Sequence, residues 1–187
     1  MMFDMKITLI AGSNREGATS TSLLRSVESL LIAQHISVTF VDLRELPLPL
    51  YSPDAQAIHP NVQRLTEAVA DAEGLILATP EYHGSISGVL KNALDYLHGG
   101  LVAGKPVLSV SAAGGPMGVS SLLHLQSIVR NLHGVNSPEW ISIGAGFHSF
   151  DSDGHPLDEG MRGRVESAVG KFVDLTRKLT AGVEAAI

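Results

Sequence analysis

The residues with the clearest chemical potential lie between positions 12 and 22, where glycines, hydroxyl side chains and one arginine are concentrated. Such groups are suited to bind a phosphate ester. Hydroxyls and free backbone N–H groups donate hydrogen bonds to its oxygens, and Arg15 adds a fixed positive charge. The same composition is also typical of a turn that caps a helix and binds nothing, and this alternative stays open.

Two familiar nucleotide-binding loops do not match this stretch. The spacing from Gly12 to Gly17 fits the start of a nucleoside-triphosphate loop, but Ala18 stands where the phosphate-binding lysine is required. A dinucleotide loop needs G-x-G-x-x-G, and here Ser13 and Asn14 follow Gly12. The stretch therefore suits a terminal monophosphate ester, and it excludes an NTPase.

The segments on either side predict a strand before the loop and a helix after it. Residues 6–11 are short, apolar and rich in β-branched side chains, which is typical of a buried strand. Thr19 or Ser20 is expected to cap the helix. Its apolar face would consist of Leu23, Leu24, Val27, Leu30 and Leu31. The loop would then present its donors at the positive end of a helix dipole.

The rest of the chain continues this alternation of strands and helices. Further strands are expected over residues 37–43, 74–79, 105–111 and 139–143, and helices over 61–72, 85–97, 119–132 and 157–179. The alternation predicts right-handed βαβ units, and hence a parallel sheet covered on both faces. We expect an α/β, flavodoxin-like three-layer sandwich with a five-stranded parallel sheet in the order 2-1-3-4-5. Its ligand edge would collect the loops 12–22, 80–85 and 111–118.

One connection of this predicted fold, residues 46–60, is unusually apolar. It is rich in proline and leucine. We expect Leu46, Leu48, Leu50 and Tyr51 to be covered by the domain or by a partner subunit.

The composition limits the possible functions. The length of 187 residues suits a single domain spanning 1–187, and the net charge of −6 argues against nucleic acid or an anionic membrane as a partner. The chain contains no cysteine, which excludes disulfides, thiolate nucleophiles and Cys-ligated metals. We find no signal peptide and no apolar run of membrane-spanning length, so we expect a soluble, cytoplasmic protein.

The second loop carries a recognisable motif. Residues 79–95 read TPEYHGSISGVLKNALD. They resemble the P-E-Y-N-G-S…LKNA-D signature of NAD(P)H-dependent FMN reductases, a flavodoxin-like family that includes quinone, azo and chromate reductases. The first loop resembles that family's G-S-x-R-x-x-S phosphate loop, and residues 111–118 form a third, glycine-rich loop. The resemblance covers about residues 5–145, with the motifs in the family's order.

The resemblance implies a set of cofactor-binding residues and no catalytic side chain. Around the FMN phosphate it places Ser13, Arg15, Ser20, Thr21 and Ser22. Along the ring and ribityl chain it places Pro80, Glu81, Tyr82, His83, Gly84 and Ser85, and on the other side of the ring Ser111, Gly114 and Gly115. The family usually has asparagine where this chain has His83, so the flavin contact at that position is open.

The activity implied by the resemblance is a ping-pong transfer of hydride from NADPH or NADH, through FMN, to a small-molecule electron acceptor. Because the flavin supplies the hydride chemistry, the protein needs a phosphate anchor and close backbone approach rather than a general base. The resemblance also implies a homodimer or homotetramer. A flavodoxin-type electron carrier and a flavin-sensing module without turnover remain the competing hypotheses.

Two other site types are disfavoured by the residues. The histidines and aspartates from His148 to His155 are better explained by an Asp-Gly turn, at Asp153, than by a metal site. Gly84 to Gly88 has Ile86 at the centre, where a serine hydrolase elbow needs serine.

Overall fold

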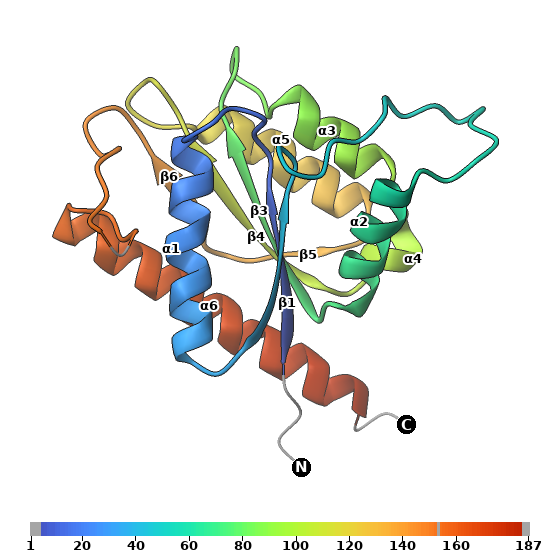
Figure 1. Cartoon of the computed structure of the whole chain (residues 1–187). Coiled ribbons are helices and arrows are strands. Elements are labelled where there is room, and N and C mark those ends of the chain that lie inside the picture. Colours follow the sequence, from blue (N-terminus) through green and yellow to red (C-terminus); the bar gives the residue numbers. More distant parts are fainter. Residues whose placement is uncertain (1–4, 153, 185–187) are drawn as a thin grey trace.

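Residues 5–152 and 154–184 are described by the computed structural model. Its central strand is β1 (Lys6–Ala11), which pairs in parallel with β2 (Ser37–Asp42) on one side and β3 (Gly74–Pro80) on the other. Beyond β3 lies β4 (Pro106–Ala112), also parallel. The sheet order β2-β1-β3-β4-β5 confirms the predicted flavodoxin-like topology (Figure 1).

The fifth position of the sheet is shared by two short strands. Both β5 (Val135–Asn136) and β6 (Ile141–Ile143) pair in parallel with β4, at its two ends. The sequence predicted one continuous strand over 139–143. Pro138 lies between the two strands, and because proline has no backbone N–H to donate, it interrupts the ladder.

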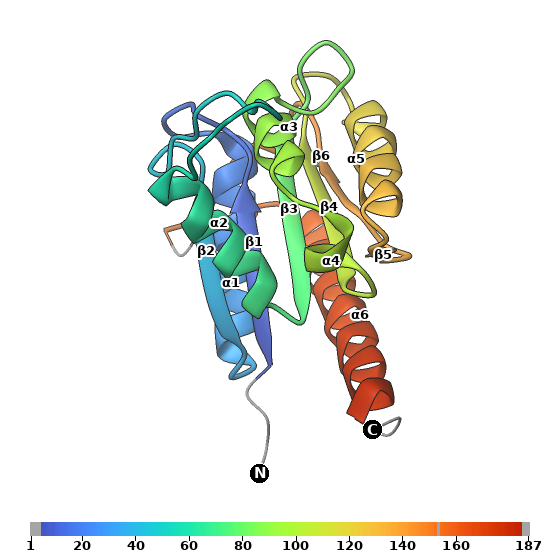
Figure 2. The ribbon, with the colours of Figure 1, turned by 90° about the vertical axis from the view of Figure 1, so that its right-hand side faces the viewer.

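Helices cover both faces of the sheet, as the alternation predicted. On one face lie α1 (Thr19–Ala33) and α6 (Glu159–Glu184), and on the other α2 (Pro60–Asp71), α3 (Gly88–Asp95), α4 (Gly99–Val102) and α5 (Val119–Asn131) (Figure 2). Each face has its own apolar core. Leu31 and Phe172 belong to the first, and Leu65, Leu90 and Leu125 to the second, all fully buried. Burial of each such side chain contributes about 1.5–3 kcal/mol.

The helix expected over residues 85–97 is shorter than predicted. It begins only at Gly88, because the Ser87 side chain accepts a hydrogen bond from the Leu90 backbone N–H at 3.1 Å and so caps it. The Ser87 hydroxyl also donates to the Gly12 carbonyl, which links the start of α3 to the end of β1. The residues before Ser87 are thereby left free to form a loop at the sheet edge.

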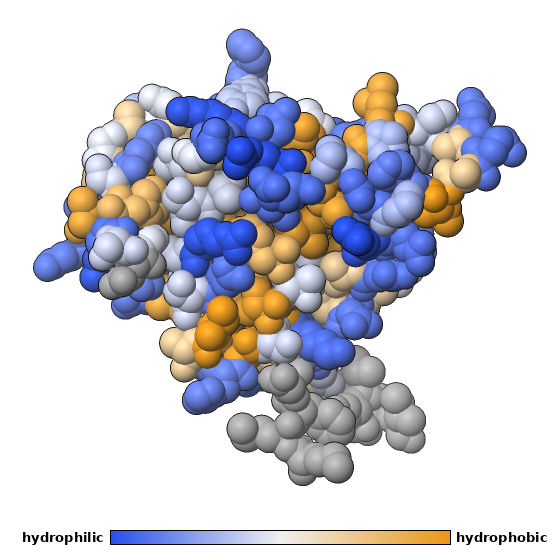
Figure 3. Space-filling model, viewed as in Figure 1, coloured by the Kyte–Doolittle hydropathy of each residue, from blue (hydrophilic) through white to orange (hydrophobic). Residues whose placement is uncertain are grey.

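The apolar connection between β2 and α2 is only partly covered. Leu46 and Leu48 pack against the second core, but Leu50 is 86% exposed and Tyr51 is 41% exposed. Hydrophobic side chains are visible on this segment at the upper right of Figure 3. The expectation of burial is thus wrong for Leu50 and Tyr51 within one chain. Asn92 on α3 holds the segment in place: it accepts from the Tyr51 N–H and donates to the Pro49 carbonyl, each at 2.8 Å.

Candidate functional site

A cavity of about 420 Å³ opens where the three loops singled out in the sequence meet. These loops follow β1, β3 and β4, so their convergence is a consequence of the parallel sheet order. The cavity is lined by Arg15, Ala18, Thr19, Ser20, Pro80, Glu81, Tyr82, Ala112, Ala113, Gly114 and His148.

The N-terminus of α1 forms the polar end of this cavity. Thr19 or Ser20 was expected to cap the helix, but the N-cap residue is Ala18, which makes no side-chain cap hydrogen bond. The first-turn backbone N–H groups therefore lack both an intrahelical partner and a side-chain cap. The Ser20 side chain is 1% exposed, and its hydroxyl has no hydrogen-bond partner.

A buried hydroxyl without a partner is costly, and here it lies beside free N–H donors and a cation. Arg15, which is exposed and lines the cavity, supplies the positive charge. An anionic phosphate would satisfy the Ser20 hydroxyl, the N–H groups and the guanidinium together. The residues present thus fit the phosphate of FMN.

The other three residues whose hydroxyls were expected around the phosphate do not line the cavity. Ser13 is buried, and its Oγ accepts from the Arg15 backbone N–H at 3.2 Å, which shapes the loop. Thr21 and Ser22 are partly buried in the first turn of α1 and do not line the cavity. The structure brings Arg15 and Ser20 together in one site, while direct phosphate contacts from Ser13, Thr21 and Ser22 stay predictions.

The second loop forms a two-residue hairpin turn. Tyr82 and Ser85 exchange both backbone hydrogen bonds at 3.0 Å, and between them His83 and Gly84 have φ angles of 51° and 73°. Such a turn requires positive φ at both central residues and favours Asn-Gly. This explains the asparagine of the family signature as a backbone preference. His83 replaces it at the exposed tip and, like Gly84 and Ser85, does not line the cavity, whereas Pro80, Glu81 and Tyr82 do.

Two side chains attach this hairpin to α5. The Glu81 carboxylate accepts from the Ser121 backbone N–H at 2.8 Å, and the Ser85 hydroxyl is hydrogen-bonded to His124 Nδ1 at 2.9 Å. The Glu81 carboxylate therefore caps the first turn of α5. This contact gives the Glu81 side chain a structural role.

The third loop is held by its own polar groups. Ser111 is fully buried and its hydroxyl donates to the Gly118 carbonyl at 2.8 Å, so its side chain supports the loop instead of lining the cavity. A Cβ on Gly118 would lie 2.5 Å from the Ser111 Oγ, which only glycine avoids. Gly114 lines the cavity, and Gly115 lies beyond it, where its carbonyl accepts from the Ala145 N–H at 2.8 Å.

His148 is a cavity residue that was not predicted from the sequence. It follows β6, outside the three motifs, and no local pattern marks it. The turn that was expected after it is present: Gly154 donates to the Asp151 carbonyl at 3.1 Å, while Asp153 lies outside the described residues. Within the ranges 5–152 and 154–184, no group of three or more potential metal ligands comes together.

Comparisons with known proteins agree with this geometry. The model of a family described as NADPH-dependent FMN reductase matches residues 5–148. An FMN-dependent NADPH-azoreductase of Staphylococcus haemolyticus is 35% identical over 161 residues, which cover 83% of this chain and 82% of that protein. A protein of the same description from Staphylococcus aureus (strain USA300) is 36% identical over 143 residues, which cover 74% of this chain and 76% of that protein.

A solved structure, the flavoenzyme NAD(P)H:(acceptor) oxidoreductase of Paracoccus denitrificans, superposes with a TM-score of 0.79 at 25% sequence identity. The superposition covers 93% of this chain and 98% of that one.

Proposed function

This chain belongs to the NADPH-dependent FMN reductase family, and from that premise we propose that its FMN occupies the cavity between the three loops, with the phosphate at the N-terminus of α1. It is an oxidoreductase that depends on FMN and NADPH. The observation that carries the placement is the buried, partnerless Ser20 hydroxyl beside the uncapped helix end. Arg15 in the same cavity supports it.

When bound, FMN supplies the hydride transfer between NADPH and an acceptor. The residues of this chain bind and orient it. Arg15 and Ser20 hold the phosphate, and the backbone around Pro80 and Ala113 lines the ring. The Tyr82 ring is 47% exposed at the rim, where it offers an apolar surface to a flat ligand. A Cβ added to Gly114 would meet no atom within 4 Å, so this part of the third loop leaves room for close approach.

We propose an azo compound as one acceptor, because the staphylococcal relatives are described as azoreductases. Quinones, chromate and free flavin are the further candidates. Two exposed apolar side chains support an aromatic acceptor: Met117 of the third loop, 52% exposed, and Phe147 after β6, 41% exposed.

The direct test of this function is anaerobic. The protein is reconstituted with FMN, desalted and mixed with NADPH or NADH while the absorbance of oxidised flavin is followed. Rapid bleaching, reversed by an azo dye or a quinone, is the expected result. Retained flavin that neither nucleotide reduces would contradict the reductase and favour an electron carrier or a sensor. If NADH bleached the flavin as fast as NADPH does, the protein would accept both nucleotides equally well.

We further propose that the chain forms a homodimer or homotetramer through the connection between β2 and α2. An apolar groove of about 480 Å³ lies between this connection and the start of α3, and Leu43, Pro47, Leu48, Leu50 and Val89 contribute to its lining. Leu50 is 86% exposed, and exposure of this apolar side chain to water is unfavourable. Contact with a second copy of the chain would bury it.

The single-domain organisation over 1–187 and the cytoplasmic location stay proposals. Among the described helices, none has the length and apolar character needed to cross a membrane. Limited proteolysis would test the first proposal and cell fractionation the second.

A further inference from the structure

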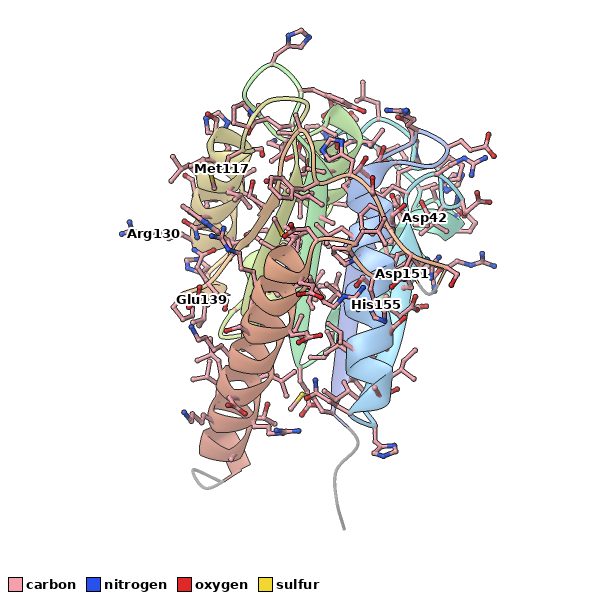
Figure 4. The ribbon with its side chains drawn as sticks, turned by 90° about the vertical axis from the view of Figure 1, so that its left-hand side faces the viewer. Asp42, Met117, Arg130, Glu139, Asp151 and His155 are labelled. Carbon is pink, nitrogen blue, oxygen red and sulfur yellow. The ribbon has the colours of Figure 1, made fainter. Side chains whose placement is uncertain are left out.

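The loop between β6 and α6 lies between the third loop and α1. At its start, the Ala145 N–H donates to the Gly115 carbonyl at 2.8 Å. Near its end, His155 Nδ1 is hydrogen-bonded to the Ser26 hydroxyl of α1 at 3.0 Å, and Figure 4 shows His155 lying against that helix. Residues between these two attachments therefore pass beside the cavity that α1 and the third loop share.

His148 is the residue of this loop that lines the cavity, together with Arg15, Thr19 and Ser20. We infer that His148 is a further ligand of the FMN phosphate and donates a hydrogen bond to it from the loop between β6 and α6. This inference rests on the proposed function, since it takes the phosphate to lie at the N-terminus of α1.

The charges around His148 favour this role. In the cavity lining, the phosphate loop contributes the cation Arg15 and the second loop contributes Glu81 and Tyr82; residues 112–114 of the third loop contribute no charged side chain. The Glu81 carboxylate already accepts from the Ser121 N–H at 2.8 Å. An imidazole donates an N–H in both its neutral and charged forms, and a phosphate oxygen accepts from either.

The contact would act on the phosphate and not on the ring. Riboflavin is the probe that separates these two parts of the ligand, because it carries the same ring and no phosphate. We therefore compare the dissociation constants of FMN and riboflavin, measured by quenching of flavin fluorescence, for the native chain and for His148→Ala. Ser149→Ala serves as a matched control, since Ser149 is the exposed neighbour on the same loop.

We expect His148→Ala to weaken FMN binding about tenfold or more, as befits loss of a hydrogen bond to a charged group, with riboflavin binding unchanged. Ser149→Ala should alter neither constant. His148→Gln, which keeps an N–H donor, should recover part of the lost affinity for FMN. Unchanged thermal unfolding of the flavin-free variants would show that the loop is intact.

An unchanged FMN constant in His148→Ala would overturn the inference, and so would equal losses for FMN and riboflavin, since these place the side chain elsewhere. Failure of the proposed function looks different. In that case the native chain itself would bind riboflavin as tightly as FMN, and Arg15→Ala would change neither constant.

Discussion

The Glu81 carboxylate accepts a hydrogen bond from the Ser121 backbone N–H at 2.8 Å, which joins the second loop to the first turn of α5. Two elements that follow different strands of the sheet are thus held by one charge-assisted contact. This contact gives Glu81 a structural role, and we predict that the residue has no catalytic one.

Substitution at Glu81 should therefore affect stability more than turnover. Glu81→Ala is expected to lower the free energy of unfolding by about 1–2 kcal/mol, because it removes a helix cap. Glu81→Gln keeps an acceptor oxygen and should retain most of the stability and the NADPH-dependent rate. Urea denaturation and steady-state kinetics would measure both, with the exposed Glu166→Ala on α6 as the control. A large loss of rate in Glu81→Gln, without loss of stability, would restore the catalytic interpretation.

Arg15→Ala should weaken FMN binding selectively. A charge-assisted phosphate contact contributes about 1.5–3 kcal/mol, which corresponds to at least a tenfold rise in the FMN dissociation constant. Riboflavin binding should be unaffected. Arg64→Ala, another exposed arginine, which lies on α2 away from the cavity, is the matched control. Equal FMN affinity in the two variants would remove Arg15 from the phosphate site.

At position 83 the backbone, with φ of 51°, should decide which residues are tolerated. His83→Asn is expected to be neutral or slightly stabilising, since asparagine accepts the left-handed conformation. A β-branched residue is strained there, so His83→Val should destabilise the protein by about 1–2 kcal/mol. Melting temperatures of the flavin-free variants would rank them. If valine were tolerated as well as asparagine, the turn would not explain the residue choice.

Lys105 should make stability depend on alkaline pH. Its ammonium donates to the Val69 and Ala70 carbonyls at the end of α2, at 2.6 and 2.9 Å. Burial lowers the pKa of this lysine below its ordinary value, and Asp71 partly opposes the shift. Between the lowered native pKa and the ordinary pKa of the unfolded chain, the unfolded state binds more protons, so this group makes stability rise with pH.

The measurement is urea denaturation of the native chain and of Lys105→Met as the pH is raised toward the ordinary lysine pKa of 10.5. The native chain should gain stability relative to Lys105→Met across this window, and show a constant difference below it. Lys178→Met, at an exposed position of α6, should follow the native curve. A native curve that falls relative to Lys105→Met would mean that the native pKa is raised.

Leu50→Asp should shift the assembly toward the monomer. A buried charge opposite apolar side chains is strongly unfavourable at an interface. Light scattering after size-exclusion chromatography would report the mass, with Leu157→Asp as the control, since Leu157 is also exposed, at 56%, but lies just before α6. A monomeric native chain, or equal dissociation by both variants, would refute this interface.

The sequence by itself determined the alternation of the main strands and helices, the sheet topology and the three loops that form the cavity. It did not predict the short helix α4 or the division of the last strand into β5 and β6. The features that it determined follow from local signals: apolar periodicity marks each element, and parallel strands joined by helices bring their carboxyl ends to one edge. Arg15 and Ser20 could be predicted as site residues in the same way, because the start of a helix is marked by local sequence.

Only the tertiary structure decided which side chains face the cavity. Ser111 lies in a glycine-rich motif, yet its hydroxyl is taken by Gly118, while His148 carries no motif and lines the cavity. The structure likewise has Ala18 at the N-cap of α1, where Thr19 or Ser20 was expected, and begins α3 only after Ser87, whose hydroxyl donates to the distant Gly12 carbonyl. The physical reason is that side-chain direction and hydrogen-bond partners depend on residues distant in sequence, whose positions exist only once the chain has folded.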